Sequence, residues 1–457
     1  MSLALDADRQ ERLPGWAPAL ALLLASAVLG PTLGAAARPL FVLGCVGVGW
    51  HAWRRGPAEH VQSVTLLFVF APFVRRLVDV AAGYDTSGVM LVGPLAALFP
   101  PLAHLPALFE RPAATERMKP MLLFIACVVY AMALTMAQGQ WMDLARDGVK
   151  WLAPVLYAMV LIDSADAEEV LDRIADLFVF VLPVIGAYGV AQYLLLPEWD
   201  RYWMQYAPIM SIGQPEPLQV RVFSTMHGPA SYATFSAAGL LLVWFRKKAW
   251  GPQLLAIPAA LGLFLSLYRT AWISMLASML FCLLFKSTRG RSAPLFIGIV
   301  VATIGAVTLT PFGDVIADRL STLTEGSQDG SARERIEEYV GLWSMPDSSL
   351  WGMGFTTVDV GTAGVMAVDG VVVACWLAMG IVVGLVCLFS LGWTLLEGFL
   401  TSLRDPREIR VLLGAFSVFS LAQLPLAAIV SGELGFLFWM FAALAMQAPS
   451  ARHWRAQ

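Results

Sequence analysis

The sequence predicts an all-α polytopic membrane protein, because the chain is apolar throughout and its uncharged runs are long enough to cross a bilayer. Of its 457 residues, 58% are hydrophobic and 14% are charged, and the mean hydropathy is +0.70. In soluble domains roughly a quarter of the residues are charged. Lipid, unlike water, accepts helices that are apolar all round. We therefore expect a single integral membrane domain over residues 1–457.

Apolar runs of about 20 residues mark the expected spans, because a helix of that length crosses the hydrocarbon core. They predict about fourteen transmembrane helices, within a range of about 12–14. The expected spans are 15–34, 36–53, 60–74, 88–109, 119–138, 148–162, 175–196, 227–245, 249–267, 269–286, 292–311, 370–392, 409–428 and 432–448. Charged residues precede the first run, which favours an uncleaved span over a signal peptide. The third run stops at Arg75 and Arg76.

The distribution of Lys and Arg predicts the orientation. With a cytoplasmic N-terminus, 19 of the 30 basic residues lie on the cytoplasmic side, so the positive-inside rule places both termini in the cytoplasm. The other 11 lie outside, and ten of them are arginine: Arg38, Arg75, Arg76, Arg146, Lys150, Arg201, Arg221, Arg269, Arg319, Arg333 and Arg335. Topology selects only for positive charge, whereas a planar guanidinium suits a phosphate or carboxylate. The bias indicates anion recognition at the outer face, with genomic base composition as the alternative.

Two long outer loops are expected, at 197–226 and 311–369. The first carries aromatic residues, which suit either a sugar-binding surface or an interfacial belt: Trp199, Tyr202, Trp203 and Tyr206. The second loop contains a short amphipathic helix at 331–343. Its Ser331 and Glu334 form a capping-box pattern, and its apolar residues recur on one face.

Four arginines before or near expected helix ends are candidate anion ligands, each with a structural alternative. Arg269 opens a span in SLYRTAW, where free N–H groups and a guanidinium together would hold an anion; a boundary arginine that snorkels is the alternative. Arg221 precedes a Ser–Thr pair and a Gly–Pro turn, where ordinary capping is equally expected. Arg75 and Arg76 form an outer pair, and Asp79 is an i+4 partner for Arg75.

A general base is harder to place. Asp369 lies where the second long loop re-enters the membrane, so burial would tune it for proton transfer, and a helix-capping role is the alternative. Further candidates are His227, Glu337 and Glu338. Neither a metal-binding spacing nor a nucleotide-binding glycine loop occurs, and the net charge of −3 gives no reason to expect nucleic acid. We expect no cofactor and no metal.

Several motifs in the second half occur in a recognisable order: RVFST, SLYRTAW, DGSARERIEEYVGLW, GMGF and VDGVVVACWLAMGIVVG. Together they resemble the O-antigen ligase and polymerase superfamily of polytopic glycosyltransferases. The resemblance implies an enzyme of the bacterial inner membrane that transfers glycan from an undecaprenyl-pyrophosphate carrier at the periplasmic face, without metal. It also implies that Arg221, Arg269 and Arg335 hold the pyrophosphate, with Arg333 as a register alternative. Three such arginines would both anchor the carrier and stabilise its departure, and we expect Arg335 to serve catalysis in this way and Asp369 to act as the carboxylate that activates the acceptor hydroxyl.

One departure separates the two branches of that superfamily. Ligases usually carry a His–Asn pair where this chain has Asp369 and Gly370. Together with PFVRRLVD, this is more similar to exopolysaccharide or O-antigen polymerases than to lipid A-core ligases. The expected partners are the carrier-linked oligosaccharide, the growing polysaccharide, membrane lipids and a chain-length regulator. A ligase, a lipid-linked glycan flippase or transporter, and a structural scaffold are the alternatives. Polar residues expected at mid-membrane are few: His104, Gln192 and Gln423.

Overall fold

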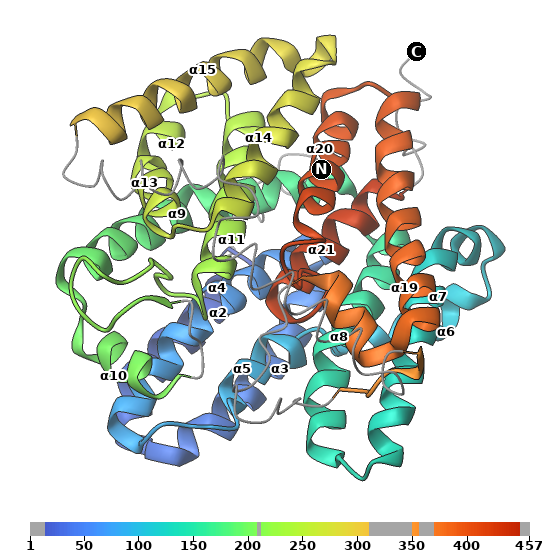
Figure 1. The fold of residues 1–457 in the computed structure, drawn as a ribbon, viewed down its shortest axis with the longest axis horizontal. Helices are drawn as coiled ribbons and strands as arrows, with labels where there is room; N and C mark the ends of the chain where they lie inside the picture. Colours follow the sequence, from blue (N-terminus) through green and yellow to red (C-terminus); the bar gives the residue numbers. More distant parts are fainter. Residues whose placement is uncertain (1–13, 208–211, 310–349, 356–369, 448–457) are drawn as a thin grey trace, which may run out of the picture.

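The computed structural model describes residues 14–207, 212–309, 350–355 and 370–447, and helices are its only regular elements over these residues (Figure 1). The elements of the first half are α2 (Ala17–Leu33), η1 (Gly34–Ala36), α3 (Ala37–Arg55), α4 (Pro57–Ala82), α5 (Val89–Ala96), η2 (Pro100–His104), α6 (Leu105–Phe109), α7 (Pro112–Ala137), α8 (Trp141–Ser164) and α9 (Ala167–Leu195). Those of the second half are α10 (Glu198–Tyr206), α11 (Pro229–Arg246), α12 (Trp250–Leu255), α13 (Ile257–Leu265), α14 (Arg269–Leu283), α15 (Lys286–Leu309), α19 (Val371–Arg404), α20 (Glu408–Gln423) and α21 (Gly432–Ala445).

The class of membrane protein is confirmed by the length and composition of the helices. Among the described residues, five helical stretches are long and apolar enough to cross a bilayer, and three shorter apolar helices accompany them. The five are Ala17–Arg55, Val89–Phe109, Pro112–Ala137, Ala167–Leu195 and Val371–Arg404. The chain is thus a helical multi-pass membrane protein. The count of about fourteen spans, the membrane and the orientation remain predictions.

Several expected spans differ in their boundaries. The run 88–109 is broken at Pro100, and the run 249–267 divides between α12 and α13 just before Pro258, because proline removes a helical hydrogen bond. The run 60–74 is longer than expected: α4 continues through Arg75 and Arg76 to Ala82. Ending that span at the two arginines was wrong. Both guanidinium groups find acidic partners inside the protein, so they need not mark the membrane boundary.

Helix α4 is the central element of the N-terminal half. It packs against α2, α3, α5, α9 and α10, and it buries polar as well as apolar side chains. The buried polar groups have partners, as a low-dielectric interior requires. His60 contacts the Tyr157 hydroxyl at 2.9 Å, and Gln62 donates to the carbonyl of Arg173 at 2.7 Å.

The expected loop 197–226 contains a helix, α10, followed by a chain segment that returns into the bundle. This segment, residues 220–228, is called the return segment below. Figure 1 shows α10 at the lower left, beside the ends of α4 and α9. We call this the α10 end of the bundle: α4 and α9 end there, and α11 and α14 begin there.

A kink in α19 receives another segment of the chain. Gly380 interrupts the helix with φ 71° and ψ 177°, and residues 350–355 lie against it. The backbone N–H groups of Met353 and Gly354 donate to the carbonyls of Leu377 and Ala378 at 2.8 and 2.9 Å. The exit of the second long loop, GMGF, is therefore fixed to α19, and Phe355 packs on Trp151 of α8 with ring centroids 5.5 Å apart.

Replacing Gly352 by alanine should destabilise this junction. A Cβ there would lie 2.4 Å from the Gly380 backbone nitrogen, and Gly352 has a positive φ of 82°, so both space and conformation oppose it. Thermal unfolding in detergent should show a lower midpoint for Gly352→Ala. Gly392→Ala, also at α19 but with open space around it, is the matched control. An unchanged midpoint for Gly352→Ala would contradict the described contact.

Candidate functional site

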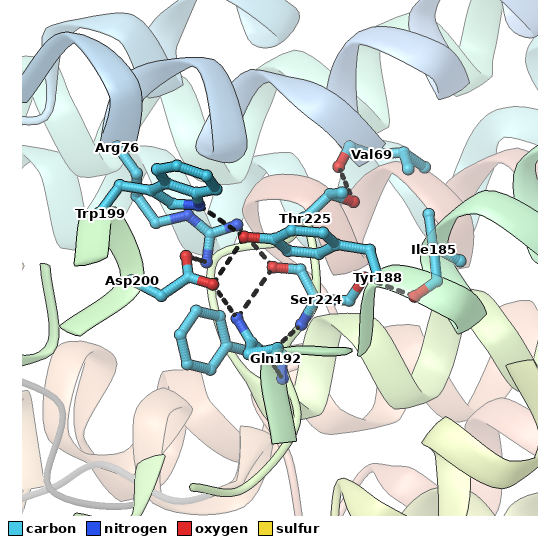
Figure 2. A network of polar contacts seen from close by, with 10 residues as sticks. Val69, Arg76, Ile185, Tyr188, Gln192, Trp199, Asp200, Ser224 and Thr225 are labelled. Atoms are coloured by element: carbon cyan, nitrogen blue, oxygen red, sulfur yellow. Dashed lines mark hydrogen bonds and ion pairs between the residues drawn. The ribbon is translucent and has the colours of Figure 1, made fainter. Parts of the chain in front are cut away.

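A buried ion pair lies at the centre of the α10 end. Arg76 of α4 is 1% exposed and Asp200 of α10 is 0% exposed, and Arg76 Nη1 lies 3.0 Å from Asp200 Oδ1 (Figure 2). Arg76 Nη2 also donates to the carbonyl of Ser224 at 2.5 Å. The guanidinium carbon lies 4.9 Å from the ring centroid of Phe223 and 6.0 Å from that of Trp203. Arg76 thus joins α4, α10 and the return segment.

Gln192 connects α9 to two of these parts, α10 and the return segment. Its amide nitrogen donates to Asp200 Oδ2 at 2.7 Å, and its oxygen accepts from the backbone N–H groups of Phe223 and Ser224 at 3.0 and 2.8 Å. Tyr188 donates to the same Asp200 oxygen at 2.6 Å (Figure 2). Tyr188 and Gln192 thus both donate to Asp200 Oδ2, whereas Arg76 Nε is buried without a hydrogen-bond partner among the described residues.

The network holds Ser224 in a strained conformation. Ser224 has φ +50°, a left-handed value that a non-glycine residue adopts at a cost of roughly 1–3 kcal/mol. Its N–H is bound by Gln192, its carbonyl by Arg76, and its hydroxyl donates to the Ile185 carbonyl at 2.6 Å. Strain that is over-determined in this way is characteristic of functional sites. Figure 2 shows Thr225, the next residue, reaching Val69 of α4.

Arg75 points to a second, separate cluster. Its Nε donates to Asp79 at 3.1 Å, which is the i+4 partner expected from the sequence, and its Cζ lies 5.2 Å from the Tyr84 ring centroid. Arg38 of α3 donates to the other Asp79 oxygen at 3.0 Å and lies within 3.9 Å of Asp85. Arg75 is therefore engaged with carboxylates, as Arg76 is.

Arg221 and Arg269 come together at one turn. Arg221 Nε and Nη2 donate to the carbonyls of Ser266 and Leu267 at 3.2 and 3.1 Å, two and three residues before Arg269 opens α14. Both side chains are only partly buried. Leu267 has φ +54°, which turns the chain sharply between α13 and α14. The guanidinium of Arg221 thus lies at the turn from which Arg269 opens a 15-residue helix.

His227 lies on the return segment among positive charges. Its ring is 5.6 Å from that of Trp203. Desolvation by the surrounding protein, with Arg75, Lys150 and Arg76 adding to it, lowers the pKa of His227 to about 3. The imidazole is therefore neutral at physiological pH. It therefore adds no positive charge to the site.

This pKa makes stability depend on pH. Because the pKa of His227 falls from 6.5 to about 3 on folding, the unfolded chain binds the proton more readily below pH 6.5. Its contribution to stability is complete above that pH and declines as the pH falls toward 3. His227→Gln should flatten the fall of the thermal midpoint between pH 6.5 and 5, measured in detergent. A variant with the wild-type pH dependence would rule out this assignment.

A carboxylate, Glu433, interacts with one of these cations, Lys150. The Ser231 hydroxyl of α11 donates to Glu433 Oε1 of α21. The N-terminal part of α21 packs on α8, because a Cβ at Gly435 would lie 3.5 Å from Pro154 Cγ, one helical turn after Lys150. The Lys150 amine lies 3.4 Å from Asp147 on its own helix and interacts electrostatically with both His227 and Glu433.

Four of the site residues predicted from sequence lie at the same end of the bundle, and nothing is described for the other two. Arg75, Arg76, Arg221 and Arg269 all lie at the α10 end. Arg335 and Asp369 lie outside the described residues, as do Arg333, the short helix at 331–343 and most of the loop 311–369. Of the aromatic residues in the first loop, Trp203 is buried under Arg76, whereas Tyr206 is 54% exposed.

Sequence reasoning missed Asp200, Ser231 and Glu433. Asp200 lies among the aromatic residues of the expected loop 197–226, and nothing in its spacing marks it as the partner of an arginine more than a hundred positions earlier. The sequence did contain a signal for Glu433. A carboxylate at the start of an apolar run is energetically unfavourable unless it has a function or a charged or hydrogen-bonding partner. The sequence marks Gln192 as a polar residue within an expected span, but it does not reveal that Gln192 binds Asp200 and the return segment.

All five cysteines are buried and free. Within the described part of the chain, no group of three or more His, Cys, Asp or Glu residues is arranged to hold a metal ion. The site consists of guanidinium groups, one lysine, one histidine and carboxylates. This set is suited to anion binding and proton transfer.

Comparison with known proteins does not assign the chain to a family. No protein-family model matches the chain, and no curated protein matches it. The fold and the site therefore define a class only: a helical multi-pass membrane protein with a cationic site at one end of its bundle.

Proposed function

We propose that this chain is a membrane glycosyltransferase that polymerises oligosaccharide repeat units carried on undecaprenyl pyrophosphate, in exopolysaccharide or O-antigen synthesis. The proposal rests on the order of motifs in the second half of the sequence. It also rests on one structural observation: Arg221 and Arg269 lie at the same turn, at the N-terminus of α14. Two forked cations at a helix N-terminus suit the two phosphates of a diphosphate.

The chemistry assigns a role to each part. A diphosphate leaving group carries charge before and after the sugar departs, so guanidinium contacts both anchor the carrier and stabilise departure. Arg76 and Arg75 support the site indirectly. Arg76 holds the return segment through the Ser224 carbonyl, and Arg75 holds the loop after α4 through the Asp85 carbonyl. Arg335 is proposed as a third anion ligand, and Asp369 as a carboxylate base. In a single displacement the anomeric configuration is inverted.

Reconstitution tests this function directly. The purified protein in proteoliposomes is given undecaprenyl-pyrophosphate oligosaccharide, and products are separated by glycan length. Longer carrier-linked glycans together with free undecaprenyl pyrophosphate are the expected result. Transfer only when lipid A-core is added would indicate the ligase instead. Movement of the oligosaccharide lipid across the bilayer, with neither elongation nor free carrier, would indicate that the protein is a flippase and not a glycosyltransferase.

A further inference from the structure

The carboxylate of Glu433 lies in an environment unlike that of the other acids at the α10 end. Asp79 and Asp200 are each 0% exposed and are bound by arginines. Glu433 is surrounded by protein, yet part of its surface remains accessible. The side chain of Glu433 is thus neither fully packed, as those of Asp79 and Asp200 are, nor fully exposed. His227 has the same combination of depth and accessible surface.

The hydrogen bonding of Glu433 leaves one oxygen available. Oε1 accepts from Ser231, which is itself 6% exposed. Oε2 accepts no hydrogen bond within the described residues. A carboxylate that is oriented through one oxygen and open at the other has the arrangement required of a general base.

Packing of α21 fixes the position of Glu433 in the bundle. Phe436, one turn later on the same face of α21, stacks on Phe68 of α4 at 4.9 Å and on Tyr157 of α8 at 6.2 Å. Glu433, one turn earlier, therefore lies close to the face of α21 that packs on α4 and α8. Ser231 of α11 meets it there through the hydrogen bond to Oε1.

The position relative to the paired arginines follows from α11. This helix packs against both α14 and α21, and its first turn carries Ser231. The return segment joins Arg221 to that turn, and it is shortened by the bond from Met226 N–H to the Phe223 carbonyl at 3.0 Å. The N-terminal part of α11 thus connects the turn that carries Arg221 and Arg269 with the helix that carries Glu433.

We propose that Glu433 is a catalytic base of this site and that Ser231 is its positioning residue; the inference rests on the glycosyl transfer proposed above. Glu433 Oε2 takes the proton of the acceptor hydroxyl. The acceptor oxygen forms a bond to the anomeric carbon of the donor sugar, and the bond from that carbon to the diphosphate oxygen breaks. The electron pair leaves with the diphosphate, which the arginines hold, and the proton passes from Glu433 to water.

Turnover and donor retention, measured separately, test this assignment. Glu433→Gln keeps the shape and the bond from Ser231 and removes the base, so turnover should fall by about 100-fold or more, while retention of radiolabelled undecaprenyl-pyrophosphate oligosaccharide stays at the wild-type level. Glu216→Gln, an exposed acid of the same end, is the matched control and should match the wild type in both. Ser231→Ala should lower kcat with KM unchanged, and Ser231→Thr should restore it.

The possible outcomes separate the two proposals. A wild-type protein that forms no product with any acceptor refutes the glycosyltransferase. An active wild type with an active Glu433→Gln variant refutes only the role of Glu433 and leaves Asp369 as the base. Equal loss of turnover and donor retention would also overturn it. If Glu433→Gln does not accumulate, Glu433→Asp replaces it: reduced turnover with retained donor supports the base, and wild-type turnover in both Glu433→Asp and Ser231→Ala refutes it.

Discussion

Replacing Asp200 by alanine should lower the free energy of unfolding by about 3–5 kcal/mol, the usual cost of removing one partner from a buried ion pair. The variant leaves the guanidinium of Arg76, 1% exposed, without its carboxylate. Tyr188 and Gln192 lose their shared acceptor at the same time. The measurement is chemical or thermal unfolding in detergent, with Glu198→Ala on the exposed side of the same helix as the control.

A double-mutant cycle separates the pair from its surroundings. Arg76→Met combined with Asp200→Leu removes both charges and keeps much of the volume, so it should be less destabilising than the sum of the single changes. An Asp200→Ala variant as stable as its control would show that the pair does not hold the return segment. Additive single effects would show that Arg76 and Asp200 act independently.

Replacing Arg269 by lysine should reduce turnover by about 10- to 100-fold, if a guanidinium–phosphate contact contributes roughly 1.5–3 kcal/mol. Lysine keeps the charge at the start of α14 but loses the planar fork that binds two oxygens together. The loss should appear in donor retention as well as in turnover, because the arginine anchors the carrier. This pattern differs from the one expected for Glu433→Gln, where retention survives.

The control for this variant is Arg146→Lys. Arg146 lies on α8 and is paired with Asp143 at 2.8 Å, so the exchange tests a general change of basic residue. It should leave turnover unaltered. Wild-type turnover and donor retention in Arg269→Lys would show that Arg269 does not bind the diphosphate and only marks the boundary of a span.

The residues of the site differ in how far the sequence revealed them. Arg221 and Arg269 were found because each precedes a helix in a recognisable motif, and such local patterns lie within a few residues. The i+4 partner of Arg75 was found for the same reason, since helix geometry fixes it. The partner of Arg76 was not found, because 124 positions separate Arg76 from Asp200 and only the packing of α10 on α4 joins them.

The sequence by itself determined the class of protein, because the length of an apolar run is a local property of the sequence and decides whether a helix can cross a bilayer. It also determined that Arg269 lies at the start of a helix. Only the tertiary structure decided which of the candidate arginines already have buried acidic partners, as Arg75 and Arg76 do. It alone placed Glu433 beside Ser231. The physical reason is that a desolvated charge must be compensated by whatever group the packing brings to it, and that group can come from any position in the chain.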